Sequence, residues 1–169
     1  MNGHPGGEAH TRRMLELAVL ERGARILDMG AGAGETLRLL RALGFDAVGI
    51  DLSPCAPEVL QGDFFAAPFP DGSFDAVLSQ CAFFVSGDVP GALREATRLL
   101  KRGGKLLLSD VFFEDPVPLL ERAGFSVLSA EDMTPQWREY YLEALWREDE
   151  PCCLPRGKCN YWLLIAERR

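Results

Sequence analysis

Hydrophobic and polar positions alternate along the chain with two different periods. Short apolar runs that end at a charged or polar residue, as in residues 24–30, 45–51 and 74–80, have the pattern of strands buried on both faces. Between such runs, residues 35–44 and 89–104 carry apolar side chains at helical spacing and end at glycines, which commonly terminate helices. This alternation predicts an α/β fold with a parallel sheet covered by helices on both faces.

The same alternation extends to both ends of the chain. Helical spacing also appears in residues 10–23 and, with aromatic side chains, in residues 136–146. Further strands are predicted over residues 58–63, 105–110, 125–132 and 160–168.

Length and composition indicate one globular domain. The chain has 169 residues, of which 47% are hydrophobic, and no linker-like or repeated segment divides it, so we expect a single domain over residues 1–169. No stretch approaches the ~18 consecutive apolar residues that span a bilayer. Residues 1–22 lack the apolar core of a signal peptide, so we expect an N-terminal segment followed by a helix. Five cysteines form an odd count, which favours thiols in a reducing compartment and hence a cytoplasmic protein.

The charge of the chain argues against one class of partner. The formal net charge is -7, and residues 131–150 are especially acidic. Such a surface repels a phosphate backbone, so nucleic acid is not an expected partner.

A glycine-rich loop follows the first predicted strand. Residues 26–37 read ILDMGAGAGETL, in which Asp28 precedes glycines at 30, 32 and 34. Because glycine has no Cβ, a ligand can lie directly against the backbone of such a loop. In parallel sheets this loop joins a strand end to a helix N-terminus, where N–H groups hold polar or anionic ligands. The sequence therefore predicts a ligand site here.

Spacing distinguishes between two classes of cofactor that use such loops. The dinucleotide fingerprint is G-x-G-x-x-G or A; counted from Gly30 and Gly32, its third position is Glu35, whose carboxylate would face a pyrophosphate. A nicotinamide-dependent oxidoreductase is therefore the weaker alternative.

The pattern D-x-G-x-G-x-G from Asp28 to Gly34 resembles the first motif of the class I S-adenosylmethionine-dependent methyltransferases. Other landmarks of that family follow in order: Asp51 at the end of the second strand, the run over residues 61–80, and LLKRGGKLLLSD over residues 99–110. The resemblance implies a Rossmann-like, doubly wound, seven-stranded sheet that is mostly parallel and has an antiparallel last strand.

The resemblance also implies S-adenosylmethionine as the cofactor and a role for each motif residue. The glycine-loop residues would lie along its methionine part: Asp28, Gly30, Ala31, Gly32 and Gly34. The residues after the second and third strands would bind the ribose and adenine: Asp51, Leu52, Asp63 and Phe64. The residues that end the fourth strand would line the path to the methyl group: Ser79, Gln80 and Cys81. The structural alternative is that the aspartates only cap loops at strand ends. Gly6, Gly7 and Thr11 resemble a segment that closes over the methionine end.

One segment departs from the family pattern. Only LSPCAPEVLQG separates Asp51 from Asp63, which is too short for the usual helical crossover of about a dozen residues. We expect a turn or a single helical turn there, with the adenine side of the site left open and Cys55 an incidental, partly buried thiol.

The sequence identifies no catalytic residue. Transfer of a methyl group from a sulfonium is an in-line displacement whose leaving group needs no proton, so alignment is the main requirement. The chain has only two histidines. Asp88, Asp110 or Glu114 could act as a general base, but each of these carboxylates could instead cap a helix or lie in solvent.

The methyl acceptor is expected to be a small molecule. Phe83 and Phe84 would form either an apolar acceptor pocket or ordinary core. Residues 131–159 are a candidate lid, because Trp137, Tyr140 and Tyr141 share one helix face, although such stripes are usually core. Since no large insertion caps the site, a second subunit of a homodimer could complete it.

Three cysteines precede the last predicted strand: Cys152, Cys153 and Cys159. Clustered thiols can hold a soft metal or metalloid, but no C-x-x-C zinc spacing is present, and a cysteine-rich loop without a ligand remains the structural alternative. A non-catalytic thiol-rich metal-binding protein is thus a further alternative function.

Overall fold

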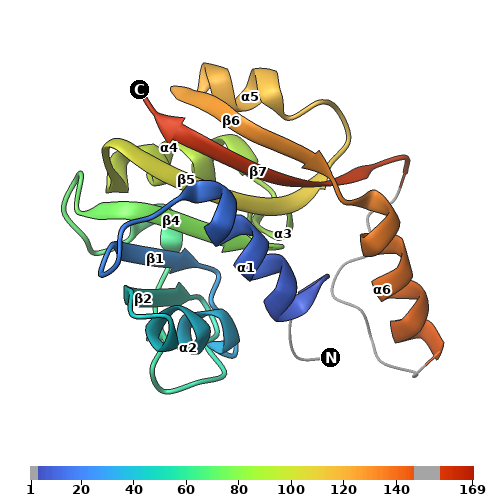
Figure 1. Cartoon of the computed structure of the whole chain (residues 1–169), viewed down its shortest axis with the longest axis horizontal. Coiled ribbons are helices and arrows are strands. Elements are labelled where there is room, and N and C mark those ends of the chain that lie inside the picture. Colours follow the sequence, from blue (N-terminus) through green and yellow to red (C-terminus); the bar gives the residue numbers. More distant parts are fainter. Residues whose placement is uncertain (1–3, 147–156) are drawn as a thin grey trace.

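The computed structural model describes residues 4–146 and 157–169. One seven-stranded sheet carries helices on both faces (Figure 1). Its strands are β1 Arg25–Met29, β2 Asp46–Asp51, β3 Leu60–Gln61, β4 Phe74–Gln80, β5 Leu100–Phe112, β6 Phe125–Asp132 and β7 Asn160–Arg168. The helices are α1 Gly7–Ala18, α2 Glu35–Ala42, the 3-10 helix η1 Phe64–Ala66, α3 Phe83–Ser86, α4 Val89–Leu99, α5 Val117–Arg122 and α6 Thr134–Trp146.

The strand order is β3-β2-β1-β4-β5-β7-β6, so the chain winds outward from β1 in both directions. Strands β1 to β5 pair in parallel, whereas β7 lies antiparallel between β5 and β6. The predicted doubly wound sheet with an antiparallel last strand is confirmed. In such a sheet the carboxyl ends of β1, β2 and β4 meet at one edge, which is where ligands bind.

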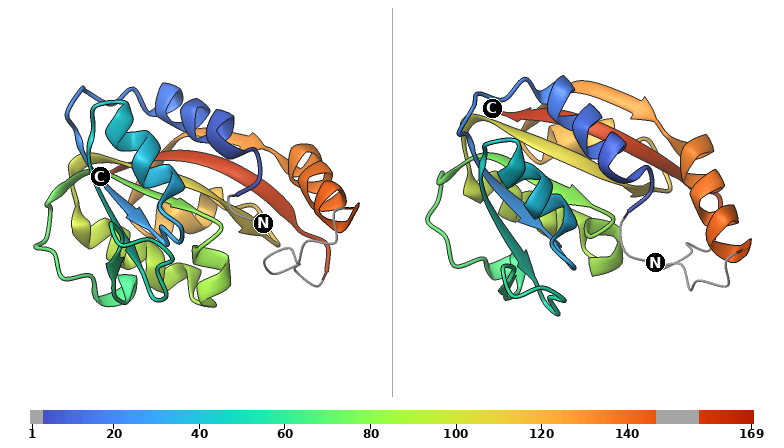
Figure 2. Two further views of the ribbon diagram at one scale, coloured as in Figure 1. Left: turned by 90° about the horizontal axis from the view of Figure 1, so that it is seen from below. Right: turned by 60° about the horizontal axis from the view of Figure 1, so that its bottom comes forward.

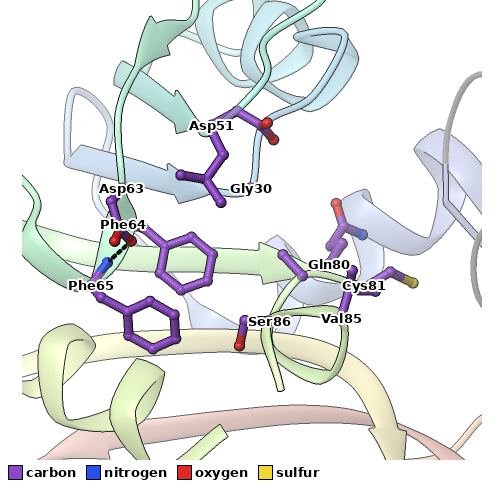
Figure 3. A pocket seen from close by; sticks show the side chains of 11 residues that line it. Gly30, Asp51, Asp63, Phe64, Phe65, Gln80, Cys81, Val85 and Ser86 are labelled. Carbon is purple, nitrogen blue, oxygen red and sulfur yellow. Dashed lines mark hydrogen bonds between the residues drawn. The ribbon is translucent and has the colours of Figure 1, made fainter. Parts of the chain in front are cut away.

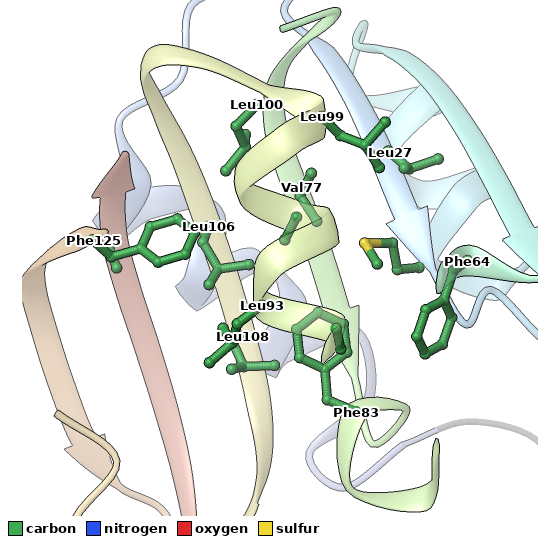
Figure 4. Close-up of a cluster of buried hydrophobic side chains, with 14 of the residues drawn as sticks. Leu27, Phe64, Val77, Phe83, Leu93, Leu99, Leu100, Leu106, Leu108 and Phe125 are labelled. Atoms are coloured by element: carbon green, nitrogen blue, oxygen red, sulfur yellow. The ribbon is translucent and has the colours of Figure 1, made fainter. Parts of the chain in front are cut away.

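Each face of the sheet has its own apolar layer, because neighbouring residues of a buried strand point to opposite faces. Leu27 of β1, Val77 of β4 and Leu93 of α4 belong to one buried cluster on one face, which Figure 4 shows. Ile26 packs with Met14 of α1 and Leu37 of α2 on the other face. Figure 2 shows α1 and α2 together on one side of the sheet and α3 and α4 on the opposite side.

The helix predicted over residues 89–104 is wrong at its C-terminal end. It stops at Leu99, and Leu100 begins β5 by pairing with Phe74 across an irregular register. Both side chains are fully buried, so their tertiary packing overrides the helical pattern. Gly103 has φ of 75° and forms part of the resulting bulge instead of a helix end.

The predicted third strand is also shorter than its pattern, since only Leu60 and Gln61 pair with β2. Residues 52–59 contain no helix, which confirms the shortened crossover. A hydrogen bond ties this crossover to the glycine loop, because Cys55 N–H donates to the Gly32 carbonyl over 3.1 Å. Cys55 itself is exposed rather than partly buried, so that expectation was wrong. Among the described residues, no helix is long and apolar enough to cross a bilayer.

Candidate functional site

Two cavities adjoin at the carboxyl edge of the sheet. The larger, of about 390 Å³, lies among β2, η1 and α3, with the rings of Phe64 and Phe65 on one side and Gln80 and Cys81 on the other (Figure 3). The smaller, of about 290 Å³, lies over the glycine loop and the start of α2. Both are lined by Gly30, Gln80 and Cys81, so these residues mark where the cavities meet.

The glycine loop owes its shape to residues with positive φ. Gly30, Gly32 and Gly34 have φ of 87°, 48° and 73°, a region that side chains with a Cβ disfavour. The N–H groups of Gly30 and Ala31 both donate to the Ile50 carbonyl, which ties the loop to β2. A Cβ at Gly30 would lie 2.3 Å from the Cβ of Ala82. The missing Cβ of Gly30 therefore leaves room for the chain's own loop after β4, which approaches the glycine backbone closely.

Asp51 holds the glycine loop from the end of β2. One carboxylate oxygen accepts from Gly32 N–H and the other from Ser53 N–H, each over 2.9 Å. The side chain lines the larger cavity, with exposed Leu52 beside it. The sequence placed this carboxylate at the correct edge, but its hydrogen bonds to the loop were not foreseen.

Asp28 is buried below the smaller cavity. It is 3% exposed, and its Oδ2 atom has no hydrogen-bond partner among the residues that the structure describes. Burial, and secondarily the charge of Asp51, raise the pKa of Asp28 to about 7. A buried carboxylate oxygen without a partner is unfavourable, so this atom suits a ligand that brings a donor or a positive charge.

Asp63 and Phe64 form the far side of the larger cavity. The Asp63 carboxylate accepts from Phe65 N–H over 2.8 Å and caps η1, which points the Phe64 ring inward. Phe65 also lines this cavity, although the sequence had singled out only Phe64. The adjacency of the two phenylalanines was the available signal.

The three predicted residues at the end of β4 differ in position. Ser79 is fully buried, donates to the Met29 carbonyl over 2.8 Å, and lines neither cavity. Gln80 and Cys81 line both. Gly34 is buried at the N-terminus of α2 and likewise lines neither.

Gln80 is the centre of a polar network that the sequence did not predict. Its Oε1 accepts from Thr36 over 3.1 Å and from Thr11 over 3.3 Å, and its Nε2 lies 3.1 Å from Nδ1 of His4. His4 and Thr36 line the smaller cavity. The network therefore holds the segment before α1 over that cavity, and its members are too distant in sequence for a local pattern to connect them.

The carboxylates considered as bases have structural roles or lie apart from the cavities. Asp110 is 1% exposed and accepts from the N–H groups of Phe84 and Val111, and burial raises its pKa to about 6. Asp88 caps α4 by accepting from Gly91 N–H over 2.8 Å. Glu114 is exposed and has no hydrogen bond or ion pair to the residues that the structure describes.

Replacement of Asp88 by alanine is expected to affect stability only. Loss of an N-cap costs about 1 kcal/mol, which corresponds to a fall in Tm of roughly 3 °C for a chain of this size. Calorimetry of Asp88→Ala beside Glu114→Ala checks this, since the exposed Glu114 should give no change. Equal melting temperatures for the two variants would contradict the capping role.

The aromatic residues are mainly core. Phe83 is fully buried, whereas Phe84 is half-buried. Trp137 and Tyr141 are buried against Tyr161 of β7, and the ring centroids of Trp137 and Tyr161 are 6.2 Å apart in a stacked arrangement. The face of α6 that the sequence offered as a lid thus packs mostly against the sheet.

The cysteine cluster is only partly covered by the structure. Cys159 is buried beside α6, and Cys152 and Cys153 lie outside the described residues. Within the described part of the chain, no three histidine, cysteine or acidic side chains are grouped as metal ligands.

Comparison with known proteins agrees with this geometry. A family model described as a methyltransferase domain matches residues 27–108, from β1 into β5. The demethylmenaquinone methyltransferase of Thermus thermophilus is 35% identical over 113 residues, which are 57% of this chain and 51% of that protein. The chain spans about half the length of the first curated relatives it matches.

Solved structures show the same fold at low identity. Phosphoethanolamine N-methyltransferase 2 of Haemonchus contortus, in complex with S-adenosylhomocysteine, superposes with a TM-score of 0.77 at 21% identity, over 98% of this chain and 53% of that one. The [4+2]-cyclase SpnF also gives 0.77, at 22% identity over 95% of this chain and 80% of that one. The fold alone therefore does not determine the reaction. The matched segment, the strand order and the glycine loop are all similar to those of class I S-adenosylmethionine-dependent methyltransferases.

Proposed function

We propose that the protein transfers the methyl group of S-adenosylmethionine to a small molecule. The observation that carries the proposal is the unpartnered, buried carboxylate oxygen of Asp28 in a cavity beside bare glycine backbone. The α-ammonium group of a methionine moiety supplies both the donor and the charge that this oxygen lacks.

The two cavities fit the two halves of that cofactor. We assign the methionine part to the smaller cavity, along Gly30, Ala31 and Gly32, and the adenosine part to the larger one. There Asp51 accepts from the ribose hydroxyls, because each of its oxygens keeps a lone pair after its backbone bond. The adenine ring lies by Phe64, and Asp63 accepts from its amino group through the oxygen not used in the cap.

The sulfonium supplies an electrophilic methyl carbon and a neutral leaving group when the cofactor is bound. The protein contributes alignment and the exclusion of water from the reacting atoms. Gln80 fixes the segment around His4 over the methionine end, and the loop after β4 borders the point where the acceptor must approach.

The names of the relatives favour a small acceptor. Curated relatives include demethylmenaquinone and phosphoethanolamine methyltransferases, and the net charge of -7 opposes a nucleic-acid acceptor. We further propose a single domain over residues 1–169 in the cytoplasm, with a homodimer as the assembly that completes the acceptor site. Light scattering tests the assembly.

Calorimetry with S-adenosylhomocysteine tests the cofactor assignment. Wild type should bind it, and Asp51→Ala should bind at least about tenfold more weakly, since loss of hydrogen bonds to a carboxylate costs at least ~1.5 kcal/mol. Asp46→Ala is the matched control, because Asp46 lies at the opposite end of the same strand, and its affinity should equal that of wild type. Equal affinities for all three proteins, or binding of NADH in place of the nucleoside, would refute the proposal.

A further inference from the structure

A line of hydrogen-bonded side chains runs from α1 across the sheet to the point where the two cavities meet. His10 Nε2 lies 2.8 Å from Ser109 Oγ, which donates to the Tyr161 hydroxyl over 2.6 Å, and that hydroxyl lies 3.3 Å from Cys81 Sγ. Ser109 and Tyr161 are fully buried, and His10 is 6% exposed. Four separate parts of the chain supply these residues, so the fold rather than local sequence assembles the line.

Packing alone does not explain these polar groups. The Tyr161 ring already stacks on Trp137 and belongs to an apolar cluster with Val111, and a phenylalanine would make the same contacts. Burying a hydroxyl and an imidazole is unfavourable unless each is satisfied by a partner. The line therefore points to a requirement at its accessible end, Cys81.

Counting hydrogens gives the line a direction. Ser109 donates its one hydroxyl hydrogen to Tyr161, so its contact with His10 is a hydrogen bond that Nε2–H donates. The hydrogen of the Tyr161 hydroxyl lies within reach of Cys81 Sγ at 3.3 Å and of the Ser109 carbonyl at 3.4 Å, and it serves the sulfur when Cys81 is a thiolate, because a thiolate has no hydrogen to donate. Burial raises the pKa of Tyr161 well above its usual value and lowers the pKa of His10 to about 4, so both groups are neutral donors near pH 7.

Cys81 lies where the reacting atoms would meet. It lines both cavities together with Gly30 and Gln80, and Figure 3 shows its sulfur directed away from Phe64 and Phe65. Its φ of 58° is unusual for a residue with a side chain, so the loop holds it in one place. If the methionine and adenosine halves occupy the two cavities, the sulfonium lies beside this residue.

We propose that Cys81 is the catalytic residue that receives the proton of the methyl acceptor, and that Tyr161, Ser109 and His10 are its positioning residues. The inference rests on the proposed function. A hydrogen bond donated to sulfur stabilises the thiolate, which is the form that takes up a proton. As the acceptor's lone pair bonds to the methyl carbon, the carbon–sulfonium bond breaks, the cofactor leaves as a neutral thioether, and the acceptor's proton passes to Cys81 Sγ.

Thiol reactivity tests the line without knowledge of the acceptor. The probe is iodoacetamide at pH 7, with the rate at each cysteine followed by mass spectrometry that resolves Cys81 from Cys55. In Tyr161→Phe the rate at Cys81 should fall about fivefold, because the thiolate loses the hydrogen bond from Tyr161 and becomes less populated, while the greater nucleophilicity of the remaining thiolate compensates in part. The rate at exposed Cys55 is the internal control and should not change.

Two further variants separate a positioning effect from a general structural one. Ser109→Ala should slow Cys81 as well, and the double variant should be no slower than Tyr161→Phe, since both changes interrupt one line. Ser126→Ala, on the exposed face of β6, is the matched control and should react as wild type. An unchanged rate at Cys81, or equal slowing at Cys81 and Cys55, overturns the proposal. Binding of S-adenosylhomocysteine is measured separately, so loss of the cofactor assignment would be recognised independently.

Discussion

Gly30→Ala is expected to destabilise the protein by about 2–4 kcal/mol, a fall in Tm of roughly 8 °C. Two effects add at this position. The residue has φ of 87°, which a side chain disfavours, and the new Cβ would lie 2.3 Å from the Cβ of Ala82. Thermal and urea denaturation measure the loss, and calorimetry should show weaker binding of S-adenosylhomocysteine, because Gly30 lines both cavities.

Two variants separate the collision from the backbone strain. Gly103→Ala introduces a Cβ at φ of 75°, and apart from the adjacent residues no atom of the described parts of the chain lies within 4 Å of it, so the change should cost only about 1 kcal/mol. Ala82→Gly removes the partner in the collision and should restore part of the stability when combined with Gly30→Ala. If Gly30→Ala is as stable as Gly103→Ala, the two loops do not approach as described.

Binding of S-adenosylhomocysteine is expected to weaken about tenfold between pH 8 and pH 6. The pKa of Asp28 is raised to about 7, so the empty site takes up a proton as the pH falls through this value. The ligand's ammonium group favours the carboxylate and lowers that pKa in the complex, so binding releases the proton. Burial also lowers the pKa of His4 in the same cavity, which favours the neutral imidazole. Calorimetry at several pH values gives the profile.

The matched variant is Asp28→Asn, which keeps the shape but cannot ionise. Its affinity should be lower and nearly independent of pH over the same range. Without ligand, the raised pKa means that the native state binds more protons than the unfolded state, so stability should fall as pH rises from about 4 to about 7. The rise in Tm caused by the ligand should therefore grow with pH. A flat profile for wild type would show that Asp28 does not meet the ammonium group.

The sequence predicted what depends on local conformation and on the geometry of parallel strands. Glycines at fixed spacing determine the loop backbone, and strand ends in a parallel sheet meet at one edge, so Asp28 and Asp51 could be located in advance. The end of α4 could not, because the packing of Leu100 on Phe74 decides it. That contact joins residues with no shared local pattern.

The polar contacts around the cavities were beyond reach for the same reason. His4 meets Gln80 across 76 positions of sequence, and Cys81 meets Tyr161 across 80. Side-chain hydrogen bonds of this range are set by how the elements pack, and neither hydrophobic period nor motif spacing contains that information. The resemblance to a family supplied strand-end residues but not the network around Gln80.

The reversed direction of β7 has a practical consequence for handling the protein. Because this strand runs antiparallel to β5, its first residues, Asn160 and Tyr161, pair with the carboxyl end of β5, at the edge of the sheet where the two cavities lie. At its other end, Arg169 N–H donates to the Gly124 carbonyl, away from that edge. His4, in contrast, borders the smaller cavity. An affinity tag or fluorescent fusion appended after Arg169 therefore leaves both cavities accessible. One attached in front of His4 would begin next to the smaller cavity.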